Sequence, residues 1–391
     1  MSRILLAWEM GGGYGHLVRL RSFIEPLLEE GHQVTVALHE TRLASRYLDD
    51  LDIRWLPAPK AMPTTNQPLE LKSFAEILLM QGFNEVEGLY GRMRCWEGIF
   101  DYVRPEVVLY DHSATAMLAF RAREVRQLAI GTGFFNPPRV TPYPLLRPWM
   151  RVGPDQLMQV EERVLEITNR ALECSGIPAM DALHEMYDLD GLALLTYPEL
   201  DHYEGRDTAD YWGVPPNIAG DPTAWPEGDG PKVFGYLNLI KPLPSLLAEL
   251  KRRRLPALIH MPAIPADLRQ TYEGSNVRLT DRPVDIEQAA AEADYCICHG
   301  GHGTVANMLL AGTPLLLLPQ NLEQLILAQR VEALGAAKIA IKLEPKPIKV
   351  ALEDLLSRRN PVDAAARFAS THDRHTVDTF AERVLDFAEG T

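Results

Sequence analysis

Short apolar runs alternate with segments of helical periodicity through the first half of the chain. The apolar runs occupy residues 3–8, 33–38, 107–111, 127–133 and 192–196. Between the first two runs, one helix face is marked by Leu17, Leu20, Ile24, Leu27 and Leu28. Gly31 follows as a helix stop signal. Alternation of strands and helices is typical of βαβ units, so the pattern predicts a parallel sheet.

The same alternation restarts after a stretch rich in proline and glycine, residues 213–231. Further apolar runs occupy residues 232–237, 257–261, 277–280, 295–301, 315–319 and 337–341. Helical patterns include 286–293 and 305–311. We therefore predict an α/β protein with two doubly wound domains that face each other across a cleft. The predicted parts are a domain at 1–215, a linker at 216–231, a domain at 232–362 and a C-terminal helix at 363–391.

Composition limits the classes of partner. The chain has 391 residues, 46% of them hydrophobic, and a formal net charge of -14, which disfavours binding to nucleic acid or anionic lipid as a whole. It has no run of about 18 apolar residues and no signal-peptide layout, so we expect a soluble, cytoplasmic protein without stable membrane insertion. Its four cysteines show neither zinc spacing nor a disulfide framework. A small-molecule ligand is the expectation.

The first glycine loop, "EMGGGYGHLVRL" at 9–20, joins the first strand to the first helix. A dinucleotide fingerprint would need a third glycine where His16 or Val18 stands, depending on the starting glycine. Glu40, at the end of the second strand, leaves a nicotinamide-binding alternative open. The Gly-Lys-Ser/Thr sequence of a Walker loop is absent.

The second glycine loop, "HGGHGT" at 299–304, follows an apolar strand and opens an apolar helix. Backbone N–H groups and the helix dipole at such a position favour an anion, and the glycines let a pyrophosphate approach closely. His299 and Thr304 add side-chain donors. Glu323 and Gln324 follow the next strand, and their carboxylate and amide suit the hydroxyls of a sugar.

These motifs occur in an order that resembles the donor-binding half of GT-B glycosyltransferases. The similarity is to the UDP-glucuronosyl/UDP-glucosyltransferase-like group, which includes bacterial macrolide and antibiotic glycosyltransferases. In order, the motifs are the glycine loop 299–304, Gly312 to Pro314, and Pro319 with Glu323-Gln324. Segment 276–301 also resembles the part of the family whose backbone holds the nucleotide base. The resemblance implies donor contacts from Gly15, Pro283, Val284, His299, Gly300, Gly301, Gly303, Thr304, Asn307, Glu323 and Gln324.

Gly15-His16 matches the N-terminal "GH" of the same family. There the histidine is the general base of an inverting sugar transfer and an aspartate after a later strand orients it, a place that Asp111 occupies here. Imidazole titrates near neutral pH and is suited to take the proton of an attacking hydroxyl. The resemblance implies a nucleoside-diphosphate sugar as co-substrate, no other cofactor and no metal. It also implies a C-terminal helix that crosses back to the N-terminal domain.

The sequence departs from the family at Asn307, where UDP-sugar enzymes often carry a glutamate that binds both ribose hydroxyls. This departure favours a dTDP-sugar, or a UDP-sugar held less tightly. A small-molecule, lipid or natural-product acceptor is expected beside segments 61–100 and 134–150, which contain Met62, Met80, Phe83, Phe134, Phe135, Tyr143 and Trp149. Two alternatives stay open: a nucleotide-sugar hydrolase or epimerase, and a non-catalytic nucleotide-sugar-binding partner protein.

Overall fold

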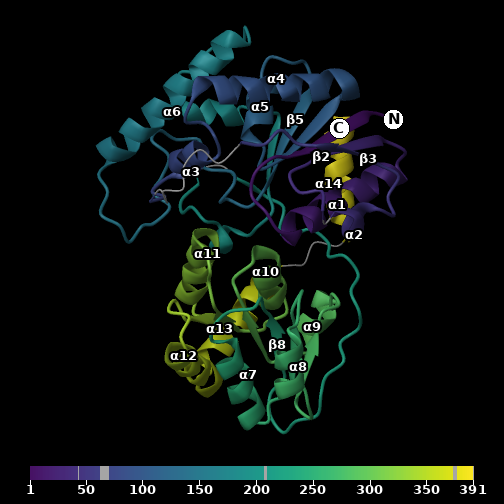
Figure 1. Ribbon diagram of the computed structural model, residues 1–391, viewed down its shortest axis with the longest axis vertical. Coiled ribbons are helices and arrows are strands. Elements are labelled where there is room, and N and C mark those ends of the chain that lie inside the picture. The colour runs from purple at the N-terminus through teal and green to yellow at the C-terminus, as the bar shows by residue number, and fades with distance from the viewer. Residues whose placement is uncertain (43, 62–69, 207–208, 373–376, 391) are drawn as a thin grey trace. The chain divides into compact units, whose positions relative to one another are not determined.

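The structure, a computed structural model, describes residues 1–42, 44–61, 70–206, 209–372 and 377–390. Within these ranges the chain forms two compact units. The first unit contains residues 1–196, residues 202–215 and the last helix, and the second contains residues 197–201 and 216–372. Figure 1 shows that each unit is a sheet with helices around it. No helix within the described ranges is long and apolar enough to span a membrane.

The described part of the first unit contains a sheet of seven parallel strands in the order β3-β2-β1-β4-β5-β6-β7. The strands are β1 (Arg3–Trp8), β2 (Gln33–Leu38), β3 (Arg54–Pro57), β4 (Val107–Asp111), β5 (Arg126–Gly131), β6 (Gly191–Leu194) and β7 (Asp210–Tyr211). The chain adds strands on one side of β1 first and then on the other side, beginning with β4. The carboxyl ends of β1 and β4 are therefore adjacent, and Trp8 pairs with Asp111 there.

Helices cover both faces of this sheet. They are α1 (Tyr14–Glu29), α2 (Ala44–Leu48), α3 (Phe74–Met80), α4 (Val86–Val103), α5 (Ala114–Phe120), α6 (Pro154–Cys174) and α14 (Val377–Glu389), with short 3-10 turns at Leu183–Tyr187 and, in the second unit, Pro198–Leu200. Successive residues of β1 point to opposite faces, and Ile4 to Trp8 are all buried, so neither face is open to water.

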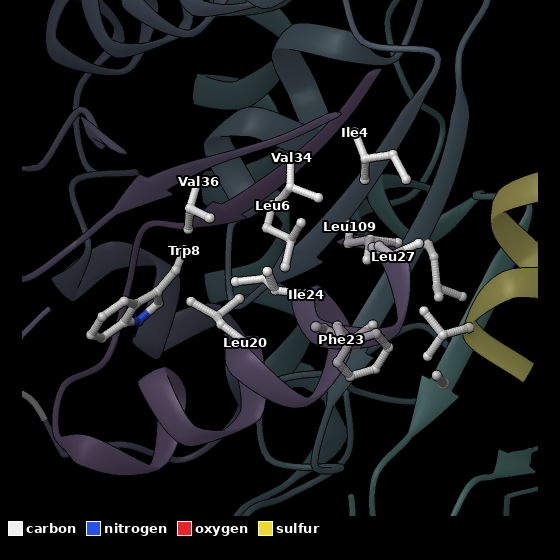
Figure 2. Packing of buried hydrophobic residues seen from close by; sticks show 14 of the residues in the cluster. Ile4, Leu6, Trp8, Leu20, Phe23, Ile24, Leu27, Val34, Val36 and Leu109 are labelled. Atoms are coloured by element: carbon white, nitrogen blue, oxygen red, sulfur yellow. The ribbon is translucent and has the colours of Figure 1, made fainter. Parts of the chain in front are cut away.

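The core on one face of this sheet joins α1 to β1 (Figure 2). The helix contributes Leu20, Phe23, Ile24 and Leu27, and the strand contributes Ile4, Leu6 and Trp8. Residues three or four apart lie on one face of a helix, and alternate residues lie on one face of a strand. The apolar face of α1 therefore packs against one face of β1 in a single layer. This packing fixes the start of α1 directly after the end of β1.

The second unit repeats the plan. Its described residues form a sheet of six parallel strands in the order β10-β9-β8-β11-β12-β13. The strands are β8 (Val233–Tyr236), β9 (Ala257–His260), β10 (Val277–Thr280), β11 (Tyr295–Cys298), β12 (Leu315–Leu317) and β13 (Ala337–Ile339). The helices are α7 (Leu243–Arg252), α8 (Ala266–Tyr272), α9 (Ile286–Glu292), α10 (His302–Leu310), α11 (Leu322–Ala333), α12 (Pro345–Ser357) and α13 (Asn360–Thr371). The strand order changes direction between β8 and β11.

Two segments differ from the sequence prediction. Residues 216–231, predicted as a linker, pack along the second unit, where Asp221 forms a parallel bridge with Val284 and Trp225 donates to the Glu292 carboxylate at 2.6 Å. The prolines prevent a helix but leave this extended pairing possible. The segment 363–391, predicted as one helix, contains the end of α13 and all of α14.

The two C-terminal helices serve different units. α13 packs against α10 in the second unit, and α14 packs against α1 in the first. The Phe380 ring lies 5.0 Å from the Phe23 ring, and Arg126 Nη1 donates to the carbonyl oxygen of Phe387 at 2.9 Å. α14 is therefore a structural part of the first unit's core.

Candidate active site

His16 and Asp111 meet at the point where the strand order of the first sheet changes direction. In open parallel sheets this point forms a crevice at the carboxyl ends of the strands. β4 delivers Asp111 to this edge, and the glycine loop after β1 delivers the first turn of α1. Gly13, at φ 105, directs the chain into the helix without a side-chain cap. His16 therefore reaches Asp111 from the first turn of α1.

The two side chains form a buried hydrogen-bonded pair. Nδ1 of His16 donates to Oδ2 of Asp111 at 2.9 Å, because the carboxylate oxygen accepts. His16 is 4% exposed and Asp111 is fully buried. The bond fixes the neutral ring as the tautomer whose Nε2 is the proton acceptor. Nε2 has no hydrogen-bond partner among the described residues, so it is available to a ligand.

Arg19 completes the arrangement and was not identified from the sequence. It lies one helical turn after His16, and its Nη1 donates to Oδ1 of Asp111 at 2.6 Å. Burial alone would raise the pKa of Asp111, but the charge of Arg19 and the hydrogen bond from His16 oppose it, and the pKa of Asp111 is lowered. Asp111 therefore stays ionised. The signal in the sequence was the spacing of three residues, which places Arg19 on the same helix face as His16.

Aromatic rings and a glycine surround the His16 imidazole. The Trp8 ring stacks on it with centroids 4.8 Å apart, and the Phe135 ring lies 5.4 Å away. Gly11 has φ 81, and a Cβ at this position would lie 2.9 Å from Nε2 of His16. Any side chain at residue 11 would therefore press against the nitrogen that accepts the proton.

In the second unit, the loops after β8 and β11 lie together where the strand order changes direction. The loop after β11 contains Gly300, at φ 86, and enters α10 through Gly301. A Cβ at Gly301 or Gly303 would meet no atom within 4 Å, so the backbone at the start of α10 is open. Thr304 is nearly buried one turn into the helix. Open N–H groups at a helix N-terminus favour a phosphate.

Both ring nitrogens of His299 are occupied by the protein backbone. Nδ1 donates to the carbonyl oxygen of Leu318 at 2.9 Å, and Nε2 accepts from the Asn238 N–H at 2.8 Å. Burial lowers the pKa of His299, although the bond to Leu318 opposes this. In this arrangement His299 is neutral and directs no N–H towards a phosphate. For the predicted phosphate contact, Nε2 of His299 would have to lose its hydrogen bond from the Asn238 N–H and bond to the ligand instead.

Asn307, at the position predicted to face the ribose, is buried and hydrogen-bonded. Its Nδ2 donates to the carbonyl oxygen of Gly303 at 2.8 Å and to Oδ1 of Asn217 at 3.3 Å. In return, Asn217 Nδ2 donates to Oδ1 of Asn307 at 2.9 Å and to Oε1 of Glu287 at 3.1 Å. The packed segment 216–231 thus contains a residue, Asn217 at its start, that sequence reasoning missed.

The backbone at Pro283 and Val284, predicted to hold the nucleotide base, is paired on one side with Asp221. Asp221 N donates to Pro283 O, and Asp285 N donates to Asp221 O, each at 2.8 Å. The backbone N–H and C=O of Val284 form no hydrogen bond with a described residue, but Gly220 packs against this peptide, and a Cβ at Gly220 would lie 2.7 Å from the Val284 oxygen. One donor and one acceptor from a single residue suit the edge of a pyrimidine.

Glu323 and Gln324 lie in the first turn of α11. Gln324 Oε1 accepts from the N–H of Gln320 at 2.8 Å, and the side chain of Asn321 caps the helix. A Cβ at Gly300 would lie 3.2 Å from the carbonyl oxygen of Gln324. The structure thus brings this pair beside the glycine loop, whereas Gly15, also predicted as a donor contact, lies in the first unit.

Three comparisons with known proteins all find similarity to glycosyltransferases. Residues 264–377 match the glycosyltransferase family 28 C-terminal domain. The PGL/p-HBAD biosynthesis rhamnosyltransferase of Mycobacterium bovis (strain BCG / Pasteur 1173P2) is 24% identical over 304 residues, which are 71% of this chain and 66% of that protein.

Two solved structures share the fold over nearly the whole length. The calicheamicin glycosyltransferase CalG4 has a TM-score of 0.71 at 17% identity, over 100% of this chain and 98% of that chain. The spinosyn rhamnosyltransferase SpnG, complexed with thymidine diphosphate, has a TM-score of 0.66 at 16% identity over 95% of each chain. The chain is a glycosyltransferase homologue with the GT-B fold.

In this glycosyltransferase homologue, the residues expected near the acceptor divide into two groups. Phe83, Phe134, Phe135 and Tyr143 are buried, and Met80 and Trp149 are about half exposed, at 50% and 46%. Met62 lies outside the described residues. Phe135 contacts the His16 ring, so it is the member of the set that the structure ties to the candidate base.

Proposed function

We propose that the protein is an inverting, metal-independent glycosyltransferase that moves a sugar from a nucleoside-diphosphate donor to a hydroxyl acceptor. The observation that carries the proposal is the buried His16–Asp111 pair, whose Nε2 is available, in a GT-B homologue of glycosyltransferases. In the proposed reaction, the acceptor oxygen attacks the anomeric carbon while its proton passes to Nε2 of His16. The anomeric C–O bond breaks and its electron pair leaves with the nucleoside diphosphate.

Each group around His16 has a role in this step. Asp111 holds the ring through Nδ1 and stabilises the imidazolium that forms. Arg19 keeps Asp111 ionised inside the protein. At the other end of the reaction, the backbone N–H groups of Gly301 and Gly303, where the glycines leave room for a ligand, would stabilise the charge that develops on the leaving diphosphate.

For the donor we propose a dTDP-sugar in preference to a UDP-sugar. Asn307 already makes hydrogen bonds to Gly303 and Asn217, so its amide offers no strong acceptor for a ribose diol. A 2′-deoxyribose lacks one of these hydroxyls and loses less at such a site. The solved relatives VinC and SpnG are complexed with this nucleotide, which supports the choice. The acceptor class remains a small molecule, lipid or natural product carrying a hydroxyl group.

The decisive experiment combines binding and turnover. Calorimetric titration with dTDP, UDP and GDP, in buffer containing EDTA, measures which nucleotide binds. The corresponding sugar donors are then incubated with acceptor libraries, with wild type and His16→Ala in parallel. We expect dTDP to bind, wild type to transfer sugar with inverted anomeric configuration, and His16→Ala to bind dTDP equally but to lose about 10²- to 10⁴-fold in turnover.

The outcomes separate the alternatives. Donor turnover without any acceptor would indicate a hydrolase or epimerase. Binding of dTDP without turnover by wild type would indicate a non-catalytic nucleotide-sugar-binding protein. Failure of all three nucleotides to bind would contradict the proposal as a whole.

A further inference from the structure

His112, the residue after Asp111, is buried and has neither ring nitrogen bonded. It is 5% exposed, and Nδ1 and Nε2 have no hydrogen-bond partner among the described residues. Its backbone is left-handed, with φ 50, and its carbonyl oxygen accepts from the Met10 N–H at 3.0 Å. The loop therefore holds the ring in place without using its polar atoms.

A buried imidazole with a structural role normally bonds to its surroundings. His32 accepts from the N–H of Ser2, His39 bonds to the carbonyl oxygen of Glu9, and His299 bonds to two backbone groups. His112 differs from these three. An unpartnered polar ring inside a protein is costly unless a ligand or an ordered water supplies the missing bonds.

The His112 ring lies beside the candidate base. A Cβ at Gly11 would lie 3.3 Å from Nδ1 of His112 and 2.9 Å from Nε2 of His16, so the two nitrogens approach the same glycine. The Phe135 ring lies 4.3 Å from the His112 ring and 5.4 Å from the His16 ring. Phe74 lies 6.3 Å from His112. Phe135 thus lies beside two imidazoles, each with a ring nitrogen that has no hydrogen-bond partner among the described residues.

The two rings offer complementary hydrogen-bonding groups. Asp111 fixes Nε2 of His16 as an acceptor. Burial is the largest cause that lowers the pKa of His112 to about 3, so the ring is neutral and carries one N–H. A hydroxyl has one proton to donate and lone pairs to accept, so it can donate to His16 and accept from His112 at once.

We propose that His112 is a second acceptor-binding residue, which donates from Nδ1 to the oxygen of an alcohol or phenol whose proton faces Nε2 of His16. This inference rests on the proposed function, because only that function makes the bound hydroxyl the nucleophile of a sugar transfer. His112 holds the oxygen, and His16 takes its proton. The pair restricts the acceptor to a group that both donates and accepts, which excludes ethers and tertiary amines at this point.

Phenol itself is the probe, because it is small and carries one hydroxyl. Protein labelled with ¹⁵N at histidine is titrated with phenol, and the ring nitrogen resonances of His16 and His112 are followed by NMR. We expect Nε2 of His16 and Nδ1 of His112 to shift with one common dissociation constant. Anisole, which cannot donate, should shift neither to the same extent. A response of His16 alone, or of neither ring, overturns the proposal.

Two substitutions test the contact within the left-handed backbone. His112→Asn keeps a side-chain N–H near the Nδ1 position, and His112→Gly removes the ring; both residue types accept a positive φ. We expect phenol affinity within about threefold of wild type for His112→Asn and a loss of roughly tenfold for His112→Gly. His32→Asn, at a buried histidine bonded to Ser2, is the control and should leave phenol affinity unchanged. Equal affinity in His112→Gly and wild type contradicts the contact.

Sugar transfer is assayed separately in wild type. If phenol shifts both rings but no acceptor is glycosylated, the hydroxyl site stands and the proposed function fails. If transfer occurs without any response of His112, the proposed function stands and this inference fails.

Discussion

Arg19 Nη1 lies 2.6 Å from the oxygen of Asp111 that His16 does not use. The Asp111 carboxylate thus accepts one hydrogen bond from the Arg19 guanidinium and one from the His16 ring. A substitution that removes the Arg19 charge therefore changes the pKa of Asp111. In Arg19→Leu, burial would act on the carboxylate without the main opposing charge, and the pKa of Asp111 would rise.

The first prediction follows from that rise. In wild type, the lowered pKa of Asp111 keeps the pair intact until the pH falls through that lowered value. In Arg19→Leu, the acidic limb of kcat/KM should move to higher pH, and the plateau should fall by roughly tenfold. Arg19→Lys keeps the charge and should shift the limb less. A pH profile of the three proteins measures both effects, and coincident acidic limbs would rule out this role for Arg19.

The second prediction concerns Gly11. Gly11→Ala should destabilise the protein by about 1 kcal/mol through its positive φ, and should lower turnover by roughly 100-fold because Cβ presses on Nε2 of His16. Gly31→Ala is the matched control, since Gly31 has φ 78 and open space around it. It should show the same loss in urea unfolding with normal turnover. Equal turnover in the two variants would contradict the steric explanation.

The third prediction separates two roles of His299. His299→Ala removes the bonds to Leu318 and Asn238 and should destabilise the second unit by about 1–3 kcal/mol. His299→Asn can keep the bond to Leu318 and should lose less. Thermal unfolding without nucleotide measures this effect, and dTDP titration of the same proteins measures the phosphate contact. Unchanged unfolding of His299→Ala would indicate that the backbone bonds contribute little.

The fourth prediction concerns the nucleoside sugar. Asn307→Glu supplies a carboxylate where the amide now bonds to Gly303 and Asn217. Hydrogen bonds to a charged group are stronger, so the affinity ratio of UDP to dTDP should rise by roughly tenfold. Glu287→Gln, next to the same asparagine pair, controls for a change of charge nearby. A ratio that does not change in Asn307→Glu would place the ribose elsewhere.

The fifth prediction is a stability change with pH at Glu9. Burial raises the pKa of this carboxyl to about 7, although the hydrogen bond from Thr115 opposes the rise. A folded-state pKa above the unfolded value stabilises the protein fully below about pH 4.5, and this contribution is lost as the pH rises through 7. Between pH 5 and pH 8, wild type should lose about 2.5 kcal/mol relative to Glu9→Gln in urea unfolding. Parallel curves for the two proteins would contradict a buried neutral Glu9.

The buried central strands could be predicted from the sequence, but two edge strands and the residues that hydrogen-bond to the predicted site residues could not. Each of the apolar runs from 3–8 to 337–341 overlaps a strand, and most of these strands are central, buried on both faces and therefore continuous apolar runs in the sequence. β3 and β7 were missed because Arg54–Pro57 and Asp210–Tyr211 are short edge strands without a fully buried residue. His16 and Asp111 were found from a resemblance. Arg19 and Asn217 were missed because neither carries a motif, and their roles depend on which elements fold beside them.

The return of α14 to the first unit has a consequence for synthesis. A ribosome releases the residues of the first sheet before those of the second, yet Phe380 and the rest of α14 emerge only after the second sheet has been made. Domains usually fold as they appear, N-terminal first. Here the unit that is translated first is the last to receive its complete core, after every strand of the other unit has been made. A premature stop just before α14 would therefore damage the beginning of the protein while leaving the second sheet whole.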